Sequence, residues 1–338
     1  MKVKTILVPL TMPLVLAACL GGGGGSGGSN ERVLFESGAA LDYAAAVGDD
    51  TGNIDTGTPV ISKVDAEAVF RFGKNRKTIR SVNLTVKDED DELFQRDFDG
   101  KTGVEVGAVE VAGRFFALEN VALDLDGNPR LDTDNEPIVN DRLYVVDRRN
   151  DNFGANRDEQ LEYMTFGLWE IGLADKNVNI GGAAFGDLSP VTDTGSMPDT
   201  GTATYRGDLI GYNILTSGAT TVYVADSFLE ANFAAPSPSV TFSSSGTRNL
   251  ATGVEDPGFN LVETTGAING NTFSGSGLTI ADLAGQAGNE DSGSFGGAFF
   301  GPEAAEAGGW FEMRNLGNSD RYFGSFGGQR GAIDVPEP

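Results

Sequence analysis

Gly293-Ser-Phe-Gly-Gly-Ala-Phe-Phe-Gly301 is the stretch that decides the fold, because glycines and large aromatic rings alternate along it. Successive side chains of a β-strand point to opposite faces, so Phe295, Gly297 and Phe299 share one face. Tyr322-Phe-Gly-Ser-Phe-Gly-Gly328 repeats this pattern. Such alternation lets strands coil tightly while the rings fill an interior or cover a neighbouring glycine. Both stretches therefore predict strands of a tightly curved sheet.

Around these two stretches, short apolar segments separated by glycine predict further strands. The expected strands cover residues 202–215, 220–233, 238–243, 258–266, 267–281, 292–301, 307–315 and 321–330. Eight antiparallel strands suit a small closed barrel, which holds packed side chains or one small ligand. The barrel shape alone therefore predicts no pocket.

The N-terminal half also consists of short β-rich blocks, for example residues 66–72, 81–86 and 143–146. Few stretches show a sustained helical period, and short helical segments are expected only over residues 39–46 and 302–307. The sequence therefore predicts an all-β protein.

A boundary between two domains is expected at residues 189–201, where proline and threonine are crowded together. Charged residues dominate before this segment, whereas glycine, serine, threonine and aromatic residues prevail after it. We therefore predict a β-rich domain over residues 31–198 and an eight-stranded antiparallel β-barrel domain over residues 199–335.

The N-terminal segment is typical of a secretory signal peptide. Lys2 and Lys4 precede an apolar run over residues 5–16, which is followed by two alanines and Cys19. A transmembrane helix is the alternative, but the run contains two prolines and is shorter than the roughly 20 residues needed to span a bilayer. Residues 1–18 are therefore predicted to be a cleaved signal peptide.

The residues before Cys19 resemble the bacterial lipobox, in which the cysteine becomes the acylated first residue of the mature protein. Lipobox proteins carry several fatty-acid chains, and this implies stable attachment to a membrane. Leu20 stands where an aspartate would resemble an inner-membrane retention signal, so the outer membrane is favoured. Residues 19–30 are almost pure glycine and serine after Leu20, which predicts a lipidated flexible tether.

The charge of the chain excludes several kinds of partner. The net charge is −25, and loss of residues 1–18 removes two lysines and no acid, which gives −27. Nucleic acid and anionic membrane surfaces both require basic clusters, so neither is an expected partner. The acidic residues form either a solvated face or a surface that recruits a basic partner.

The chain contains no histidine, and its one cysteine is the predicted lipidation site. A Ser-His-Asp triad, a Cys-His nucleophile, the usual zinc sites and histidine-ligated haem therefore have no ligands or bases here. A disulfide within the chain is also excluded. Paired carboxylates, as in glycosidases, are the chemistry that remains open. The expectation is a protein that is not an enzyme.

A calcium site is one interpretation of an acidic segment in the N-terminal half. Its oxygen-bearing side chains surround a glycine turn, as hard cations require. The candidate ligands are Asp124, Asp126, Asn128, Asp132 and Asp134. No other cofactor is expected. The alternative is an acidic surface turn, because Pro129 and Arg130 interrupt the segment and no EF-hand helices flank it.

Three further groups of residues have alternative interpretations. Residues 87–92 form a charge run, which is either a solvated hairpin tip or a point where a partner docks. Trp169 and Trp310 are expected in the core rather than as ligand platforms. Phenolates are the remaining strong ligands for iron, although a surface or core role is favoured for every candidate. These candidates are Tyr144, Tyr163, Tyr205 and Tyr322.

Read together, several C-terminal motifs resemble the barrel of the transferrin-binding protein B family. They are Met197-Pro-Asp-Thr-Gly201, Gly270-Asn-Thr-Phe-Ser-Gly275, Gly293-Ser-Phe-Gly-Gly-Ala-Phe-Phe-Gly301, Gly308-Gly-Trp-Phe311 and Gly324-Ser-Phe-Gly-Gly-Gln-Arg330. The resemblance covers residues 197–330. Tyr163-Met-Thr-Phe-Gly-Leu-Trp169 is similar to a strand of the handle domain that precedes this barrel in the broader group of solute-binding relatives.

The resemblance implies a lipid-anchored binding protein, with a handle-like domain before the barrel, on the surface of a Gram-negative outer membrane. It implies capture of a protein or small solute, and as partners an outer-membrane TonB-dependent transporter and the surface-export machinery. The full-length transferrin receptors of this family carry two handle-barrel lobes. This chain has room for one, so transferrin is not the expected ligand. The alternative is a structural, adhesive or shielding lipoprotein that transfers no cargo.

Overall fold

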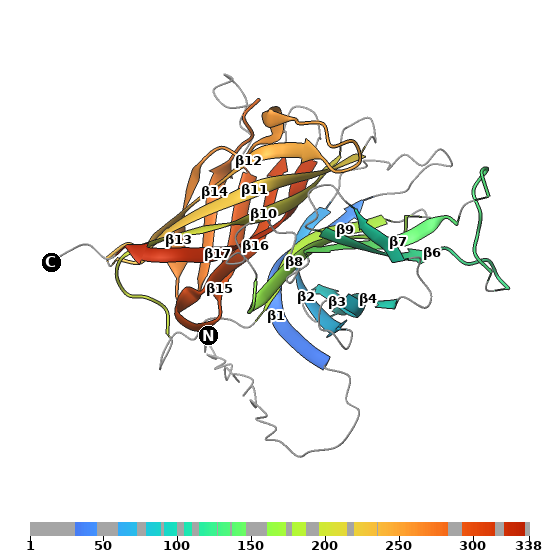
Figure 1. The fold of residues 1–338 in the computed structure, drawn as a ribbon, viewed down its shortest axis with the longest axis horizontal. Coiled ribbons are helices and arrows are strands. Elements are labelled where there is room, and N and C mark those ends of the chain that lie inside the picture. Colours follow the sequence, from blue (N-terminus) through green and yellow to red (C-terminus); the bar gives the residue numbers. More distant parts are fainter. Residues whose placement is uncertain are drawn as a thin grey trace, which may run out of the picture.

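A computed structural model gives the architecture, which consists of a curved sheet beside a closed barrel (Figure 1). The described residues are 31–45, 60–72, 79–88, 91–99, 105–109, 115–126, 128–135, 137–146, 161–173, 178–186, 196–214, 220–234, 236–282, 293–314 and 321–334. The predicted signal peptide and tether, with Cys19, lie outside these residues.

The first sheet, which we call the handle, has nine strands in the order β4-β3-β2-β1-β9-β8-β7-β6-β5. Neighbouring strands within it pair in antiparallel fashion. The strands are β1 (Glu31–Ala45), β2 (Val60–Phe72), β3 (Ile79–Asp88), β4 (Asp91–Asp99), β5 (Glu105–Val109), β6 (Phe115–Val121), β7 (Val139–Val146), β8 (Met164–Ile171) and β9 (Val178–Gly186).

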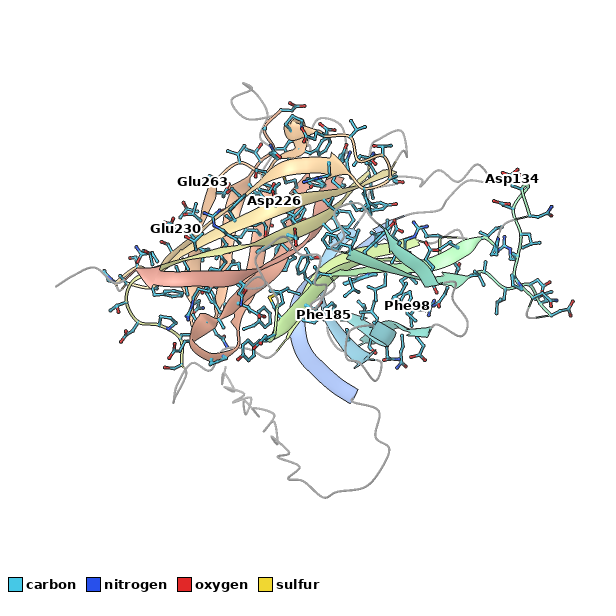
Figure 2. The ribbon with its side chains drawn as sticks, in the orientation of Figure 1. Phe98, Asp134, Phe185, Asp226, Glu230 and Glu263 are labelled. Carbon is cyan, nitrogen blue, oxygen red and sulfur yellow. The ribbon has the colours of Figure 1, made fainter. Side chains whose placement is uncertain are left out.

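The handle curls around a core of its own. Buried residues from β2, β3, β4 and β6–β9 form this core, and Phe98 and Phe185 lie within it (Figure 2). Across the mouth of the curl, the Asn120 side chain donates to the backbone carbonyl of Asp97 at 3.1 Å. The Arg96 guanidinium also lies 3.4 Å from the buried carboxylate of Asp141. These contacts bring β4 close to β6 and β7.

The second sheet closes into a barrel of eight strands, β10 to β17 in chain order. They are β10 (Thr202–Ile214), β11 (Thr220–Asn232), β12 (Ser239–Asn249), β13 (Thr264–Asn269), β14 (Thr272–Leu278), β15 (Gly293–Phe300), β16 (Glu306–Arg314) and β17 (Arg321–Asp334). Pairing of β10 with β17 closes the sheet on itself. The all-β prediction, with an eight-stranded antiparallel barrel after a β-rich segment, is confirmed.

Two of the predicted elements are wrong. A helix is expected over residues 39–46, but residues 39–45 are instead part of β1, which pairs with β2 on one side and β9 on the other. Pairing on both edges overrides the helix propensity of alanine. The strand expected from residue 258 begins at Thr264, because Pro257–Phe259 forms a short 3-10 helix with proline in its first turn. The turn expected at residues 302–307 is a 3-10 helix over Pro302–Ala304.

Within the described part of the chain, no helix has both the length and the apolar character needed to cross a membrane.

Candidate functional site

The barrel interior is filled by aromatic side chains. Phe242 stacks on Phe326 with ring centroids 4.1 Å apart, and Phe273 meets Phe299 edge-on at 5.2 Å. Phe242 also lies 5.3 Å from Phe295, measured between ring centroids. These rings belong to one buried cluster inside the barrel. A small ligand would have to displace these rings, so the interior is a packed core rather than a pocket.

The alternation of glycine and aromatic residues in the sequence explains this packing. A Cβ atom on Gly211 would lie 2.6 Å from the Tyr322 ring, and one on Gly297 would lie 2.7 Å from the Phe273 ring. Each ring therefore occupies space that a neighbouring glycine leaves empty. The predicted face of Phe295, Gly297 and Phe299 points inward.

The four tyrosines considered as iron ligands are not brought together. Tyr144 and Tyr163 lie between the handle and the barrel, whereas Tyr205 and Tyr322 lie inside the barrel. The Tyr205 hydroxyl donates to the carbonyl of Ala304 at 2.8 Å. Burial raises the pKa of Tyr205 and that of Tyr322 far above the ordinary range, which opposes formation of the phenolate that iron requires. The structure therefore favours the core role.

The handle packs on the barrel through an apolar contact that we call the seam. It joins β6–β9 of the handle to β10, β11, β15, β16 and β17 of the barrel. Leu168 and Met164 of β8 are fully buried there, and so is Ile210 of β10. Trp310 of β16 also lies in the seam, whereas Trp169 lies in the handle core. The prediction that both tryptophans are core residues is confirmed.

Two side chains from the barrel make hydrogen bonds to the backbone of the handle across the seam. The buried carboxylate of Glu306 accepts the backbone N–H groups of Tyr163 at 3.0 Å and Met164 at 2.8 Å, and also that of Glu162. The Ser325 hydroxyl donates to the carbonyl of Gly167 at 2.7 Å. In both contacts the partner in the handle is a backbone group, so the contacts hold the backbone of β8 in place against the barrel.

One end of the seam carries a row of charged side chains from β6, β7 and β8. Arg142 lies between two carboxylates, with its Nε 2.6 Å from Glu119 and an Nη 3.1 Å from Glu170. Strand register explains the row, because Glu119 and Glu170 are the cross-strand partners of Arg142. Tyr212 of the barrel extends the row through a hydrogen bond to Glu170, and Thr220 bonds Tyr212 in turn.

Burial and the neighbouring charges shift the pKa values of the residues in this row. Burial raises the pKa of Glu170 above its ordinary value, and the charge of Arg142 opposes that shift. Burial is the largest single effect and by itself lowers the pKa of Arg142, but Glu170, Tyr144 and Glu119 together outweigh it, and the net pKa is raised. Burial also raises the pKa of Tyr212, and Glu170 adds to the shift. Tyr212 therefore stays protonated at neutral pH. Its hydrogen bond to Glu170 joins the barrel to the handle.

The predicted calcium ligands lie in the excursion between β6 and β7, residues 122–138, which we call the finger. Asp124 accepts the backbone N–H groups of Asp126 at 2.9 Å and Asn128 at 2.8 Å, and Asp132 accepts that of Asp134 at 2.8 Å. These carboxylates thus cap turns of their own loop. Among the described residues, no three histidine, cysteine or acidic side chains are grouped to hold a metal ion. Calcium binding stays a prediction.

The charge run at residues 87–92 connects β3 to β4. Asp88 is the cross-strand partner of Asp91, and Lys87 is that of Glu92. The run therefore lies at a hairpin between two antiparallel strands, which both interpretations expect. Whether a partner docks there stays an open prediction.

Two features of the structure were not identified from the sequence. The first is the seam, although β8 carries a signal for it. Every residue of Met164–Ile171 is buried. A strand that is buried on both faces is mostly apolar along its whole length, and this pattern was the available signal. The second is the set of exposed leucines in the finger. Leu125 is completely exposed, with a relative accessibility of 107%, and Leu123 and Leu131 are more than half exposed.

Comparison with known proteins identifies the barrel. Residues 197–330 match the family model described as the C-lobe and N-lobe β-barrels of transferrin-binding protein B. The chain matches no curated protein sequence.

Solved structures of transferrin-binding protein B are also similar, at low sequence identity. A single tryptophan-to-alanine mutant of the protein from Haemophilus parasuis has 14% identity and a TM-score of 0.36, over 88% of this chain and 76% of that one. The isotype 1 protein from serogroup B Neisseria meningitidis has 16% identity and a TM-score of 0.35, over 88% of this chain and 58% of that one.

The similarity to this family rests on the match to the barrel model, which begins just before β10 and ends within β17. It agrees with the closed eight-stranded barrel and with its glycine-separated aromatic core. Residues 197–330 of this chain are therefore similar to the barrels of transferrin-binding protein B.

Proposed function

We propose that this chain is a binding protein, anchored by lipid to the outer membrane and displayed on the cell surface, that captures a protein ligand through its exterior. The family of the barrel supports this proposal, since its members are named for binding a protein. The sequence adds that the chain lacks histidine and has one cysteine, so a Ser-His-Asp triad and a Cys-His nucleophile are both excluded. The proposed role is therefore binding rather than catalysis.

The observation that carries the proposal is the packed interior of the barrel. The aromatic rings of β10–β17 contact one another where a small ligand would sit in a barrel of this size. A ligand is therefore held by outer surfaces or by loops, and such surfaces suit a protein better than a small solute.

The anchor completes the proposal. Acylation of Cys19 would hold the chain to the membrane, and the glycine-rich residues 20–30 would let the handle and barrel stand away from it. We propose delivery of the ligand to a TonB-dependent transporter in the same membrane, after surface export of the lipoprotein.

Capture from the native medium tests the proposal. Soluble protein beginning at residue 20, which lacks the lipidation site, is immobilised, exposed to spent medium and host fluids, and washed in physiological salt. A second column carries an unrelated β-barrel of equal net charge. Mass spectrometry should find one protein enriched on the first column alone. Equal recovery on both columns would indicate the structural or shielding alternative.

A further inference from the structure

The finger consists of two copies of one short pattern. Leu123-Asp-Leu-Asp-Gly-Asn-Pro129 and Leu131-Asp-Thr-Asp-Asn-Glu-Pro137 share the spacing leucine, aspartate, any residue, aspartate, two residues and proline. In each copy the leucine forms an antiparallel β-bridge with the proline that ends the copy. In each copy the aspartate that follows the leucine caps its own turn. The finger is thus a tandem pair of equivalent turns.

Backbone hydrogen bonds join the two turns at a common base. The N–H of Ala122 donates to the carbonyl of Ile138 at 2.8 Å, and the N–H of Ile138 donates to the carbonyl of Arg130 at 2.9 Å. The N–H of Arg130 donates back to the carbonyl of Ala122 at 2.8 Å, which closes a ring of three bonds. The finger therefore has defined backbone geometry even though it projects away from the barrel, as Asp134 shows (Figure 2).

The side chains on this base combine apolar and acidic groups. Leu125 is fully exposed at 107%, and Leu123 and Leu131 are 55% and 51% exposed. These leucines account for three of the four exposed large hydrophobic residues in the described part of the chain. Residues 122–138 contain five acids and one basic residue, Arg130. The finger thus displays leucines within a strongly negative surface.

We propose that the finger is the surface on which the protein ligand docks, and that the ligand has an apolar pocket surrounded by lysine and arginine. This inference rests on the proposed function, which it extends by locating the contact. The leucines would enter the pocket while the carboxylates of the finger face the basic rim. Because the base already fixes the backbone, docking costs little ordering of the chain.

The negative charge of the finger argues against the other partners that could dock on it. Nucleic acid and the anionic surface of a membrane would be repelled by the acids of the finger. A second copy of this chain carries the same net charge of −25 and presents the same acidic finger, so self-association through this surface is also opposed. A protein face with an apolar pocket and a basic rim would contact the leucines through the pocket and the carboxylates through the rim.

Synthetic peptides of defined chemistry provide the test. Binding of the mature protein is measured by biolayer interferometry with three probes: a peptide alternating leucine and lysine, one alternating serine and lysine, and one alternating leucine and glutamate. The leucine–lysine peptide should bind saturably, and each of the other two should bind at least tenfold more weakly. Failure of the leucine–lysine peptide to bind would overturn the inference.

Matched variants separate the finger from general attraction to an acidic protein. Leu125→Ser should weaken binding of the leucine–lysine peptide at least tenfold, whereas Val254→Ser, at a 64% exposed residue of the barrel, should change it less than twofold. The double variant Asp126→Asn with Asp134→Asn should weaken binding and reduce its dependence on salt. The control double variant Glu230→Gln with Glu263→Gln, at exposed barrel positions, should not.

Equal effects of the finger and barrel variants would overturn the inference, because the attraction would then come from overall charge. The test is independent of the proposed function. If finger variants still capture the ligand found in the medium, the docking surface is wrong and the binding function stands. If the native protein captures no ligand, the binding function itself fails, whatever the peptides do.

Discussion

The carboxylate of Glu306, on barrel strand β16, accepts the backbone N–H of Met164, on handle strand β8, at 2.8 Å. The same carboxylate accepts two further N–H groups at the start of β8. Around it, buried side chains from both sheets form one apolar cluster. The handle is therefore held against the barrel by a buried acceptor as well as by hydrophobic contact.

Loss of this acceptor should destabilise the protein. Glu306→Ala leaves the buried backbone N–H of Met164 and the part-buried N–H groups of Glu162 and Tyr163 without their acceptor, which costs about 3 kcal/mol. Urea unfolding of the mature chain, followed by tryptophan fluorescence, should show this loss because Trp169 and Trp310 are both buried. Glu230→Ala, at an exposed site on the barrel, serves as the control and should change the free energy of unfolding by less than about 0.5 kcal/mol. Equal changes in the two variants would show that Glu306 does not hold the seam.

A single methyl group should be enough to disturb the seam. A Cβ atom on Gly182 of β9 would lie 2.9 Å from the backbone carbon of Gly324 on β17, where neither backbone has room to move. Gly182→Ala should therefore cost about 1–3 kcal/mol of unfolding free energy. For Gly331→Ala the nearest atom is the Thr204 carbonyl oxygen at 3.5 Å, so that variant should be near neutral. Both are measured by thermal unfolding, and an unchanged melting temperature for Gly182→Ala would contradict the close packing.

The buried acid Glu170 predicts a specific pH dependence. Burial raises its folded-state pKa above the ordinary value of 4.5, so between those two pKa values the folded state binds more protons than the unfolded state. The contribution of this residue to stability is therefore most favourable below pH 4.5 and declines as pH rises through the folded pKa. Glu170→Gln removes the titration. The melting temperature of the variant, relative to wild type, should rise as the pH increases above 4.5. A difference that stays constant or falls would contradict the assignment.

The aromatic core predicts a large effect inside the barrel. Phe242 is fully buried and contacts Phe295 and Phe326, so Phe242→Ala should cost about 3–5 kcal/mol. Phe228 is only half-buried, with Arg206 at 5.4 Å from its ring, and Phe228→Ala should cost less than half as much. Denaturant unfolding of both variants gives the comparison. Similar costs would show that the interior is not packed as described.

The predicted lipid anchor depends on the sulfur atom of Cys19. Cys19→Ser removes the only thiol in the chain, so it should abolish incorporation of labelled palmitate and release the protein from the membrane fraction. Label that persists on the variant would refute lipidation at Cys19.

Protease added to intact cells should remove the wild-type protein if it faces outward. Protection until the outer membrane is opened would place it in the periplasm.

The barrel was largely predictable because its signals are local. Rings and glycines alternate along single strands, so residues 293–301 and 321–330 mark their strands to within a few positions. The connection between β12 and β13 was harder to predict. Residues 258–263 have a strand-like composition, yet Pro257 begins a 3-10 turn and Leu261 bridges to Ile280 instead.

The contacts between distant segments could not be read from the sequence. Glu306 and Met164 are 142 positions apart, and nothing near Glu306 marks it as an acceptor for β8. β1 was misassigned for a similar reason, since its alanines favour a helix until β2 and β9 pair with it. The finger was found as an acidic segment, but the exposure of Leu125 depends on how its two turns fold back on a shared base.

Stoichiometric binding tests the central claim most directly. The protein enriched from the native medium is purified and titrated into the mature chain, and the complex is measured by isothermal titration calorimetry and light scattering in physiological salt. A binding protein of this design should saturate at one ligand per chain, as a discrete complex. Heat that never saturates, or the absence of a discrete complex, would contradict the claim that this chain is a ligand-capturing protein.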